Sequence, residues 1–140
     1  MNKKTLVTFL ILAVLVVFGF GSCASSSAVD DAHNSRNSLD WEGVYTGTIP
    51  AADCPGINVR LTLNKDQSFV LLYEYIDRPD SNNNSTGSFK WDKKGNIVIL
   101  DIKNTPPYYK VAENKLIQLD MKGKPISGDL ADNYVLKKSL

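Results

Sequence analysis

Histidine and cysteine are scarce in this sequence. One histidine, His33, and two cysteines, Cys23 and Cys54, occur in 140 residues. His33 lies in a polar N-terminal segment ahead of the expected domain, so no Ser–His–Asp or Cys–His arrangement can form inside that domain. A glycine-rich phosphate-binding loop is also lacking, and the carboxylates are dispersed over separate segments. We therefore expect no catalytic residues and a protein that is not an enzyme.

A net charge of one sign is equally absent. The sequence has 16 lysine and arginine residues against 15 aspartate and glutamate residues. Lys3 and Lys4 precede every acidic residue, so a chain without its N-terminal leader carries 14 basic and 15 acidic residues, a net charge of −1. No basic stripe runs through the sequence. This balance argues against nucleic acid or an anionic lipid surface as an electrostatic partner.

No apolar run is long enough for a membrane span, and the longest one has the features of a secretory signal. Lys3 and Lys4 precede the apolar run Leu6–Phe20, which ends in Gly21 and Ser22. A membrane-spanning helix needs ~20 apolar residues to cross about 30 Å of hydrocarbon. A basic head, a shorter apolar core and small residues at its end are typical of a cleaved signal peptide. Residues 1–22 are therefore predicted to be removed rather than retained as a membrane anchor.

The segment Phe20-Gly21-Ser22-Cys23 resembles the bacterial lipobox, in which an apolar residue and two small residues precede the cysteine that receives diacylglycerol. Phe20 stands where leucine is usual. Acyl chains hold a protein on a membrane because each buried methylene contributes ~0.8 kcal/mol. We expect Cys23 to carry the lipid, and Ala24 after it, in place of aspartate, favours the outer membrane. If Cys23 were not lipidated, a disulfide to Cys54 would be the alternative.

The mature sequence has two parts. Residues 23–40 contain the lipidated cysteine and a Ser-, Asp- and Asn-rich stretch without hydrophobic periodicity, which predicts a flexible tether. In residues 41–140, short alternating apolar runs are separated by turn residues, as in half-buried strands. They predict the following strands: Trp41–Ile49, Ile57–Leu63, Phe69–Ile76, Gly87–Trp91, Ile97–Ile102, Tyr108–Val111, Lys115–Leu119 and Tyr134–Lys137.

The expected fold is all-β, a small antiparallel eight-stranded lipocalin-like barrel. No segment has the pattern of an amphipathic helix, and short strands joined by hairpin loops predict an antiparallel meander. A flat sheet of that size would leave two exposed edges, which closure into a barrel removes. Glycine is expected at positive φ in two loops: Gly95 in the hairpin loop Asp92–Asn96, and Gly56 in a type II turn after Pro55.

The segment Trp41–Ile57 carries a motif that goes beyond a generic strand, since it ends in Ala52-Asp53-Cys54-Pro55-Gly56-Ile57. Together with Tyr73-Glu74-Tyr75 and Gly87–Trp91, this motif resembles the NlpE N-terminal domain family, and the resemblance extends to Lys138. It implies an outer-membrane lipoprotein with a lipocalin-like barrel. It also implies a link to copper tolerance, surface adhesion and envelope-stress signalling through the Cpx sensor kinase. Some family members carry a second, OB-fold domain, which we do not expect here.

One departure from the family pattern concerns metal binding. The family's Cys-x-x-Cys would put thiols at positions 51 and 54, but position 51 is Ala51. Two thiolates at that spacing can bind Cu(I) or zinc, or close a redox-sensitive disulfide, whereas a single thiolate cannot. In the mature chain, His33 and Met121 are the remaining imidazole and soft ligands, and a tight site needs several ligands in fixed geometry. We therefore expect neither a bound metal nor a cofactor.

Two functional hypotheses follow for the domain. The first is a sensor or interaction module that contacts an envelope protein of the sensor-kinase type, with Asp53, Cys54, Pro55 and Gly56 as the candidate functional turn. Cys54 is there either a small residue buried at the barrel rim or an exposed reactive thiol. The alternative is a lipocalin-like carrier, because an eight-stranded barrel is either filled by side chains or able to hold one small apolar ligand.

Overall fold

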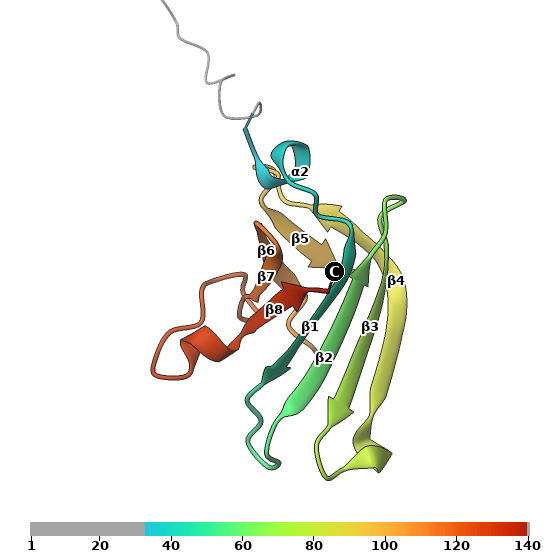
Figure 1. The fold of residues 1–140 in the computed structure, drawn as a ribbon, viewed down its shortest axis with the longest axis vertical. Helices are drawn as coiled ribbons and strands as arrows, with labels where there is room; N and C mark the ends of the chain where they lie inside the picture. The colour runs from blue at the N-terminus through green and yellow to red at the C-terminus, as the bar shows by residue number, and fades with distance from the viewer. Residues whose placement is uncertain (1–32, 140) are drawn as a thin grey trace, which may run out of the picture.

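The computed structural model describes residues 33–139, which form a closed antiparallel β-barrel (Figure 1). Each strand pairs with the next along the chain and β8 closes onto β1, so the predicted eight-stranded lipocalin-like barrel is confirmed. Among the described residues, no helix has the length and apolar character of a membrane span. The elements are α2 (Ser35–Ser38), β1 (Gly43–Ile49), β2 (Ile57–Leu63), β3 (Ser68–Tyr75), η1 (Pro79–Ser81), β4 (Asn83–Trp91), β5 (Ile97–Leu100), β6 (Tyr108–Ala112), β7 (Lys115–Gln118), η2 (Ala131–Asn133) and β8 (Val135–Lys138).

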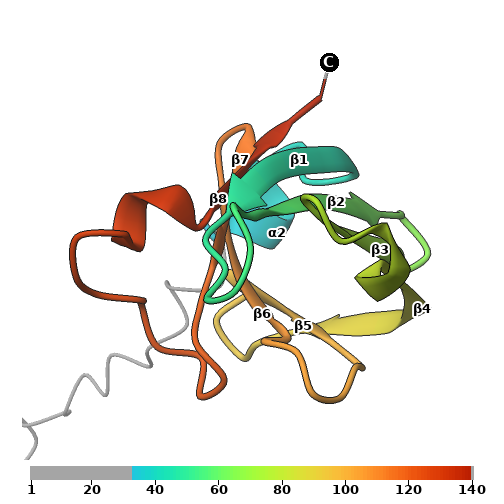
Figure 2. The same cartoon turned by 90° about the horizontal axis from the view of Figure 1, so that it is seen from below.

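Alternating side chains fill the inside of the barrel, which the strands surround when it is viewed from below (Figure 2). In β2, for example, Val59, Leu61 and Leu63 are buried, while Asn58 and Arg60 point to the other face. Burial of each such side chain contributes about 1.5–3 kcal/mol. No core residue is more than 6% exposed, and the core consists of Tyr45, Ile49, Val59, Leu61, Leu63, Phe69, Leu71, Tyr73, Phe89, Val98, Leu100, Tyr109, Val111, Leu116 and Leu136.

The two halves of the barrel differ in strand length. β1, β2, β3 and β4 have 7, 7, 8 and 9 residues, whereas β5, β6, β7 and β8 have 4, 5, 4 and 4. Figure 1 shows the first four strands extending below the others. β4 therefore pairs with β5 only at Phe89, Lys90 and Trp91, although it pairs with β3 along its lower part.

Residues 34–40 pack on the upper end of the barrel, the end that carries α2 (Figure 1). Asn34 is buried, and its side chain caps α2 by accepting from Asn37 N at 3.1 Å. Ser35 N donates to Asn96 Oδ1 at 2.9 Å, and Ser35 Oγ donates to Val111 O at 2.9 Å. Residues 34–40, which were expected to belong to a flexible tether, thus make specific contacts with the barrel. Their polar groups bond to the ends of two hairpins instead of to water alone.

The strand seam between β1 and β8 is short and lies at the same upper end. Its register comprises two residue pairs, Tyr45 with Lys138 and Thr46 with Lys137. Next to it, Lys138 Nζ donates to the carbonyl oxygen of Asp40 at 2.7 Å and to Asp40 Oδ2 at 2.8 Å. The N-terminal segment thus supports the point where the barrel closes.

Several strand boundaries differ from the expected ones. β1 begins at Gly43 rather than at Trp41, because the Trp41 ring packs edge-on against Phe89 and Trp91, with centroids 5.8 and 5.4 Å away. Such aromatic contacts contribute ~0.5–1.5 kcal/mol beyond the buried area. β4 begins at Asn83, four residues before the expected start at Gly87. Asn and Ser favour turns locally, but pairing with β3 overrides that preference.

The two glycine predictions have different outcomes. Gly95 has a φ of 69°, as expected for the β4–β5 hairpin loop. Gly56 has no positive φ, so the predicted type II turn is wrong. A Cβ atom at Gly56 would lie 3.0 Å from Thr48 Cγ2 and 3.3 Å from the carbonyl oxygen of Ile49. A side chain there would crowd β1, because the loop passes close to that strand.

Candidate functional site

The candidate turn Asp53–Gly56 lies in the loop between β1 and β2, at the end of the barrel opposite α2 (Figure 1). The loop between β3 and β4, which contains η1, lies at the same end. We call residues 50–56 and 76–82 together the lower rim. These loops follow the longest strands, so they extend beyond the short strands of the other half of the barrel (Figure 1).

An ion pair joins the two loops of the lower rim. Arg78 Nη1 donates to Asp53 Oδ2, and the two side chains are 47% and 62% exposed. Water screens charges at this exposure, so the pair contributes ~0–1 kcal/mol to stability. Its main effect is positional, because it holds the Asp53 carboxylate toward the neighbouring loop. Asp53 was predicted from the sequence, whereas Arg78, which lies 25 positions further on, was not.

Cys54 is half-buried, between the two alternatives expected for it. Its Sγ donates a weak hydrogen bond to the carbonyl oxygen of Gly56 at 3.3 Å. The same carbonyl accepts from Ile76 N at 3.1 Å, which links the turn to the end of β3. The thiol is free, and residues 33–139 contain no second cysteine. The reactivity of Cys54 stays a prediction.

The imidazole and thiol ligands expected from the sequence lie at opposite ends of the barrel. His33 precedes α2 at the upper end, whereas Cys54 lies in the lower rim. Met121 is 56% exposed in the connection between β7 and β8, and Ala51 offers no ligand atom. Within residues 33–139, no group of three or more His, Cys, Asp or Glu residues is placed to hold a metal ion.

A buried polar cluster inside the barrel was not predicted from the sequence. Tyr73 Oη and Tyr109 Oη lie 3.3 Å apart, and burial raises the pKa of Tyr73 and, more strongly, that of Tyr109. Gln118 pairs with Tyr109 in the β6–β7 register and is 3% exposed, and its Oε1 has no hydrogen-bond partner among the described residues. Its spacing from Leu116 could have shown that Gln118 points inward.

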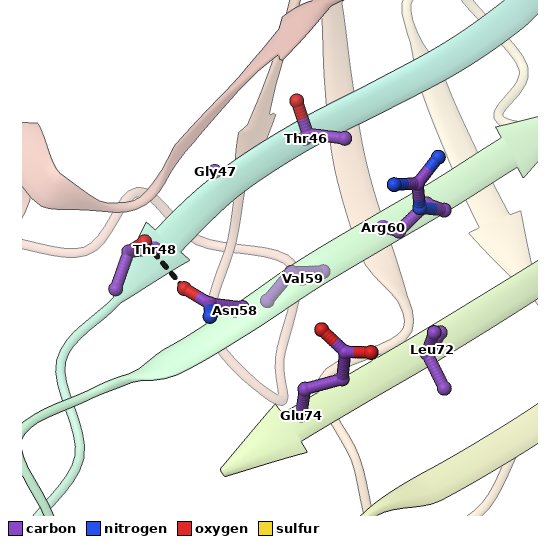
Figure 3. Close-up of a pocket in the computed structure, with 8 residues that line it drawn as sticks. All are labelled: Thr46, Gly47, Thr48, Asn58, Val59, Arg60, Leu72 and Glu74. Carbon is purple, nitrogen blue, oxygen red and sulfur yellow. Dashed lines mark hydrogen bonds between the residues drawn. The ribbon is translucent and has the colours of Figure 1, made fainter. Parts of the chain in front are cut away.

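The outer face of β1, β2 and β3 carries a shallow polar groove of about 340 Å³ (Figure 3). Thr48 Oγ1 donates to Asn58 Oδ1 at 2.8 Å across it. Arg60 and Glu74 stand on neighbouring strands and form no ion pair with any described residue. The groove can hydrogen-bond a polar segment, but it contains no nucleophile beside a base. Its lining residues are Thr46, Gly47, Thr48, Asn58, Val59, Arg60, Leu72 and Glu74.

The match to known proteins decides the family. The family model of the NlpE N-terminal domain matches residues 45–129, which include the candidate turn. The chain belongs to the NlpE N-terminal domain family. It is 28% identical over 144 residues to Lipoprotein NlpE of Escherichia coli strain K12, covering 98% of this chain and 58% of that protein. It is 29% identical over 109 residues to the 17 kDa lipoprotein of Treponema pallidum, covering 69% of each.

Two solved structures share the fold. A protein of Shewanella oneidensis, solved at 1.42 Å resolution, is 42% identical with a TM-score of 0.68, covering 75% of this chain and 94% of that chain. The Cpx pathway activator NlpE from E. coli is 30% identical with a TM-score of 0.52, covering 62% of this chain and 46% of that chain. The chain thus spans little more than half the length of the E. coli relative, at 58%.

The resemblance found in the sequence is confirmed by these matches. Both relatives from E. coli and T. pallidum are lipoproteins, so the NlpE-like domain here is that of an envelope lipoprotein family. Cys23 and the predicted signal peptide, residues 1–22, lie outside the described residues. Lipid attachment at Cys23 and a functional role for Asp53–Gly56 therefore stay predictions.

Proposed function

We propose that this chain is a lipid-anchored envelope protein that acts by contacting another protein, without catalysis of its own. Signal peptidase removes residues 1–22, and Cys23 carries the lipid that holds the barrel on the membrane. Membership of the NlpE family and the lipoprotein character of both curated relatives support this anchor.

The observation that carries the proposal is the position of the N-terminal segment relative to the lower rim. Ser35 bonds to Asn96 and Val111 at the upper end, whereas Asp53 and Arg78 pair at the lower end. His33 lies ten positions after Cys23, a separation that spans at most about 35 Å of extended chain. The upper end therefore stays near the lipid surface, and the lower rim faces a partner in the periplasm.

The arrangement of chemically reactive groups supports binding rather than catalysis. Cys54 has a backbone carbonyl as its hydrogen-bond partner, not a base that could activate the thiol. His33 is at the other end of the barrel, and Asp53 is engaged by Arg78. These groups cannot act together on one bound molecule.

The alternative function, a carrier of a small apolar ligand, has less support. The inward-facing core residues are at most 6% exposed, and the bond between Tyr73 and Tyr109 crosses the interior. An apolar ligand would have to displace these side chains and break that bond. Binding at the outside of the barrel needs neither change.

The outer membrane is the proposed location, since Ala24 follows Cys23. A sensor kinase of the envelope is the proposed kind of partner, because the E. coli relative is a Cpx pathway activator. A link to copper stress would then run through signalling. Direct metal binding at Cys54 has little support because Ala51 removes the second thiol of the family motif.

Separate experiments test the anchor and the rim. Cys23→Ser is expected to abolish palmitate labelling and release the chain from membrane fractions, while Cys54→Ser does neither. A photo-crosslinking amino acid at Pro55 is expected to capture a sensor kinase, identified by mass spectrometry, whereas the same probe at Lys65, in the β2–β3 turn at the upper end, captures none. Continued labelling of Cys23→Ser contradicts the anchor, and equal capture from both positions contradicts the rim.

A further inference from the structure

β5, β6, β7 and β8 form the half of the barrel with the shorter strands, and their outer surface has a distinct composition (Figure 1). Burial alternates along each of these strands, so every second side chain points away from the core. None of the outward residues is acidic, and the set thus combines apolar side chains with charge of one sign. We call it the β5–β8 face, which consists of Ile97, Ile99, Tyr108, Lys110, Ala112, Lys115, Ile117, Val135 and Lys137.

The strand register brings three lysines of this face together. Lys115 of β7 pairs with Lys137 of β8, and residues directly opposite in an antiparallel pair have Cβ atoms about 4.5–5.5 Å apart. Lys110 of β6 pairs with Ile117, two positions beyond Lys115, so Lys110 is a diagonal neighbour of Lys115 at about 7–8 Å. Because the lysines come from three strands, the even charge balance of the sequence does not reveal them.

These lysines have no internal counter-charge. Lys110, Lys115 and Lys137 are all exposed, and none forms an ion pair with a carboxylate of residues 33–139. Glu113 in the β6–β7 turn and Asp101 just after β5 border the face, and neither carboxylate forms an ion pair within the described part of the chain. Like charges directly opposite in a sheet are destabilising. An anionic partner from outside the chain would relieve this repulsion.

Apolar side chains lie between the lysines. Lys110 stands between Ile97 and Ile117 in the register, and Ile117 pairs with Val135. All three apolar residues are only partly buried. At a lipid interface, such side chains reach below the headgroups, while the long lysine side chains keep their ammonium groups at the phosphates. A free anion would satisfy the lysines alone.

We propose that the β5–β8 face lies on an anionic phospholipid surface, with its lysines at the headgroup phosphates. Charge complementarity favours this occupant, because a membrane presents many phosphates at once to lysines on separate strands. A second copy of the chain is disfavoured, since a two-fold contact through this face would set lysines against lysines. The contact is made by protein side chains and is separate from the lipid on Cys23.

The position of the face suits a barrel held on a membrane. On this point the inference rests on the proposed anchor, whose linker from Cys23 to His33 spans at most about 35 Å. Residues 34–40 bond to the upper end, and Lys115 and Lys137 lie at that end of β7 and β8. The tether therefore holds the face within reach of the headgroups. The lower rim follows the longer strands of the other half and stays accessible.

Co-sedimentation with lipid vesicles tests the proposal on the chain from Ala24 onward, which retains every described residue and carries no lipid. We expect it to bind vesicles of equal amounts of phosphatidylcholine and phosphatidylglycerol, but not vesicles of phosphatidylcholine alone. Binding should be lost as the salt concentration rises, because ions screen the lysines. Since Cys23 is absent, this result is independent of palmitate labelling, which tests the anchor.

Two double variants locate the contact. Lys115→Gln with Lys137→Gln is expected to weaken binding to the mixed vesicles about tenfold or more. Lys65→Gln with Lys103→Gln removes the same net charge from the β2–β3 turn and the β5–β6 loop, and is expected to leave the affinity unchanged. Lys115→Glu faces Lys137, so it should weaken vesicle binding while raising the melting temperature. Loss of binding in this more stable variant excludes misfolding as its cause.

Several outcomes overturn the proposal. One is a chain that leaves the mixed vesicles unbound at low salt, and another is equal binding to both kinds of vesicle. Equal weakening by the two double variants would show a response to net charge rather than to the β5–β8 face. Binding to polyglutamate without binding to the mixed vesicles would assign the face to an acidic protein instead.

Discussion

The hydroxyl of Tyr73 lies 3.3 Å from the hydroxyl of Tyr109, so a hydrogen bond joins β3 to β6 through the inside of the barrel. The two strands are not neighbours, because β4 and β5 separate them in the sheet. Tyr73 is 6% exposed and Tyr109 is fully buried. Removing one partner of a hydrogen bond in such an interior leaves a buried polar group unsatisfied, which lowers the stability of the fold.

Tyr109→Phe is therefore expected to destabilise the barrel by about 1–3 kcal/mol, because it leaves the buried Tyr73 hydroxyl without its partner. Tyr73→Phe should have a similar cost, and the double variant should cost less than the sum of the two. Urea unfolding at neutral pH measures each free energy. Tyr108→Phe, on the same strand and only half-buried, is the control. Strictly additive costs would contradict the coupling.

Stability should fall at alkaline pH. Burial, and then the charge of Asp40, raises the pKa of Tyr45 to about 12 from an ordinary value of 10.0, and burial also raises the pKa of Tyr73 and Tyr109. Stability from these groups is complete below about pH 10 and is lost as the pH rises toward the folded pKa, because the unfolded chain releases its protons first. Unfolding free energies across this range measure the loss. Tyr45→Phe should make the decline less steep, and an unchanged slope would exclude Tyr45 as a source.

Asn96→Ala should release the N-terminal segment from the upper end. It removes the oxygen that accepts from Ser35 N at 2.9 Å, a bond worth about 0.5–1.5 kcal/mol. Hydrogen exchange should accelerate at residues 35–39 while the strand amides keep their protection. Asn58→Ala, at an exposed position of β2, is the matched control. Protection that survives Asn96→Ala would show that other contacts hold the segment.

Gly47→Ala should weaken the closure of the barrel. The added Cβ would lie 2.6 Å from the carbonyl oxygen of Val135 and 3.0 Å from Leu136 Cδ2, and a backbone atom cannot move aside by changing a rotamer. Overpacking of this kind costs ~1–3 kcal/mol. Thermal unfolding measures the loss, and Thr48→Ala on the same strand should change stability by no more than about 0.5 kcal/mol. Equal melting temperatures for the two variants would refute the close contact.

Ala51→Cys should create a site for thiophilic metals, because it restores the Cys-x-x-Cys spacing with Cys54. Titration of Cu(I) against a competing chelator should give tighter binding than for the unmodified chain. Ala52→Cys adds a thiol at the wrong spacing and serves as the control. Equal affinities for the two variants would mean that the spacing does not matter.

The strands could be predicted because their signal is local. Val59, Leu61 and Leu63 alternate with polar residues, and that period alone indicates a half-buried strand. The placement of residues 34–40 could not be predicted in the same way. Ser35 finds its partners 61 and 76 positions away, at Asn96 and Val111, and polar residues give no periodic signal.

The candidate site was predictable in position but not in its contacts. The motif around Cys54 led to the turn, and the family match covers it. Its contacts depend on which loops and strands the closed barrel brings together. Asp53 pairs with Arg78, 25 positions away, and Tyr73 pairs with Tyr109, 36 positions away. At Gly56 a local signal was misleading. The Pro-Gly pair predicted a type II turn, but the φ of Gly56 is not positive, and what distinguishes the position is its close approach to Thr48.

The short seam between β1 and β8 determines how the barrel would respond to mechanical tension. Its register comprises two residue pairs, and Lys138 bonds to Asp40 just ahead of it. A force applied along the N-terminal segment loads the bonds of Ser35 to Asn96 and Val111 first and then the Asp40–Lys138 contact, before it separates β1 from β8 pair by pair. Rupture under load therefore begins at the end nearest the proposed anchor, while the long pairing of β2 with β3 is still intact.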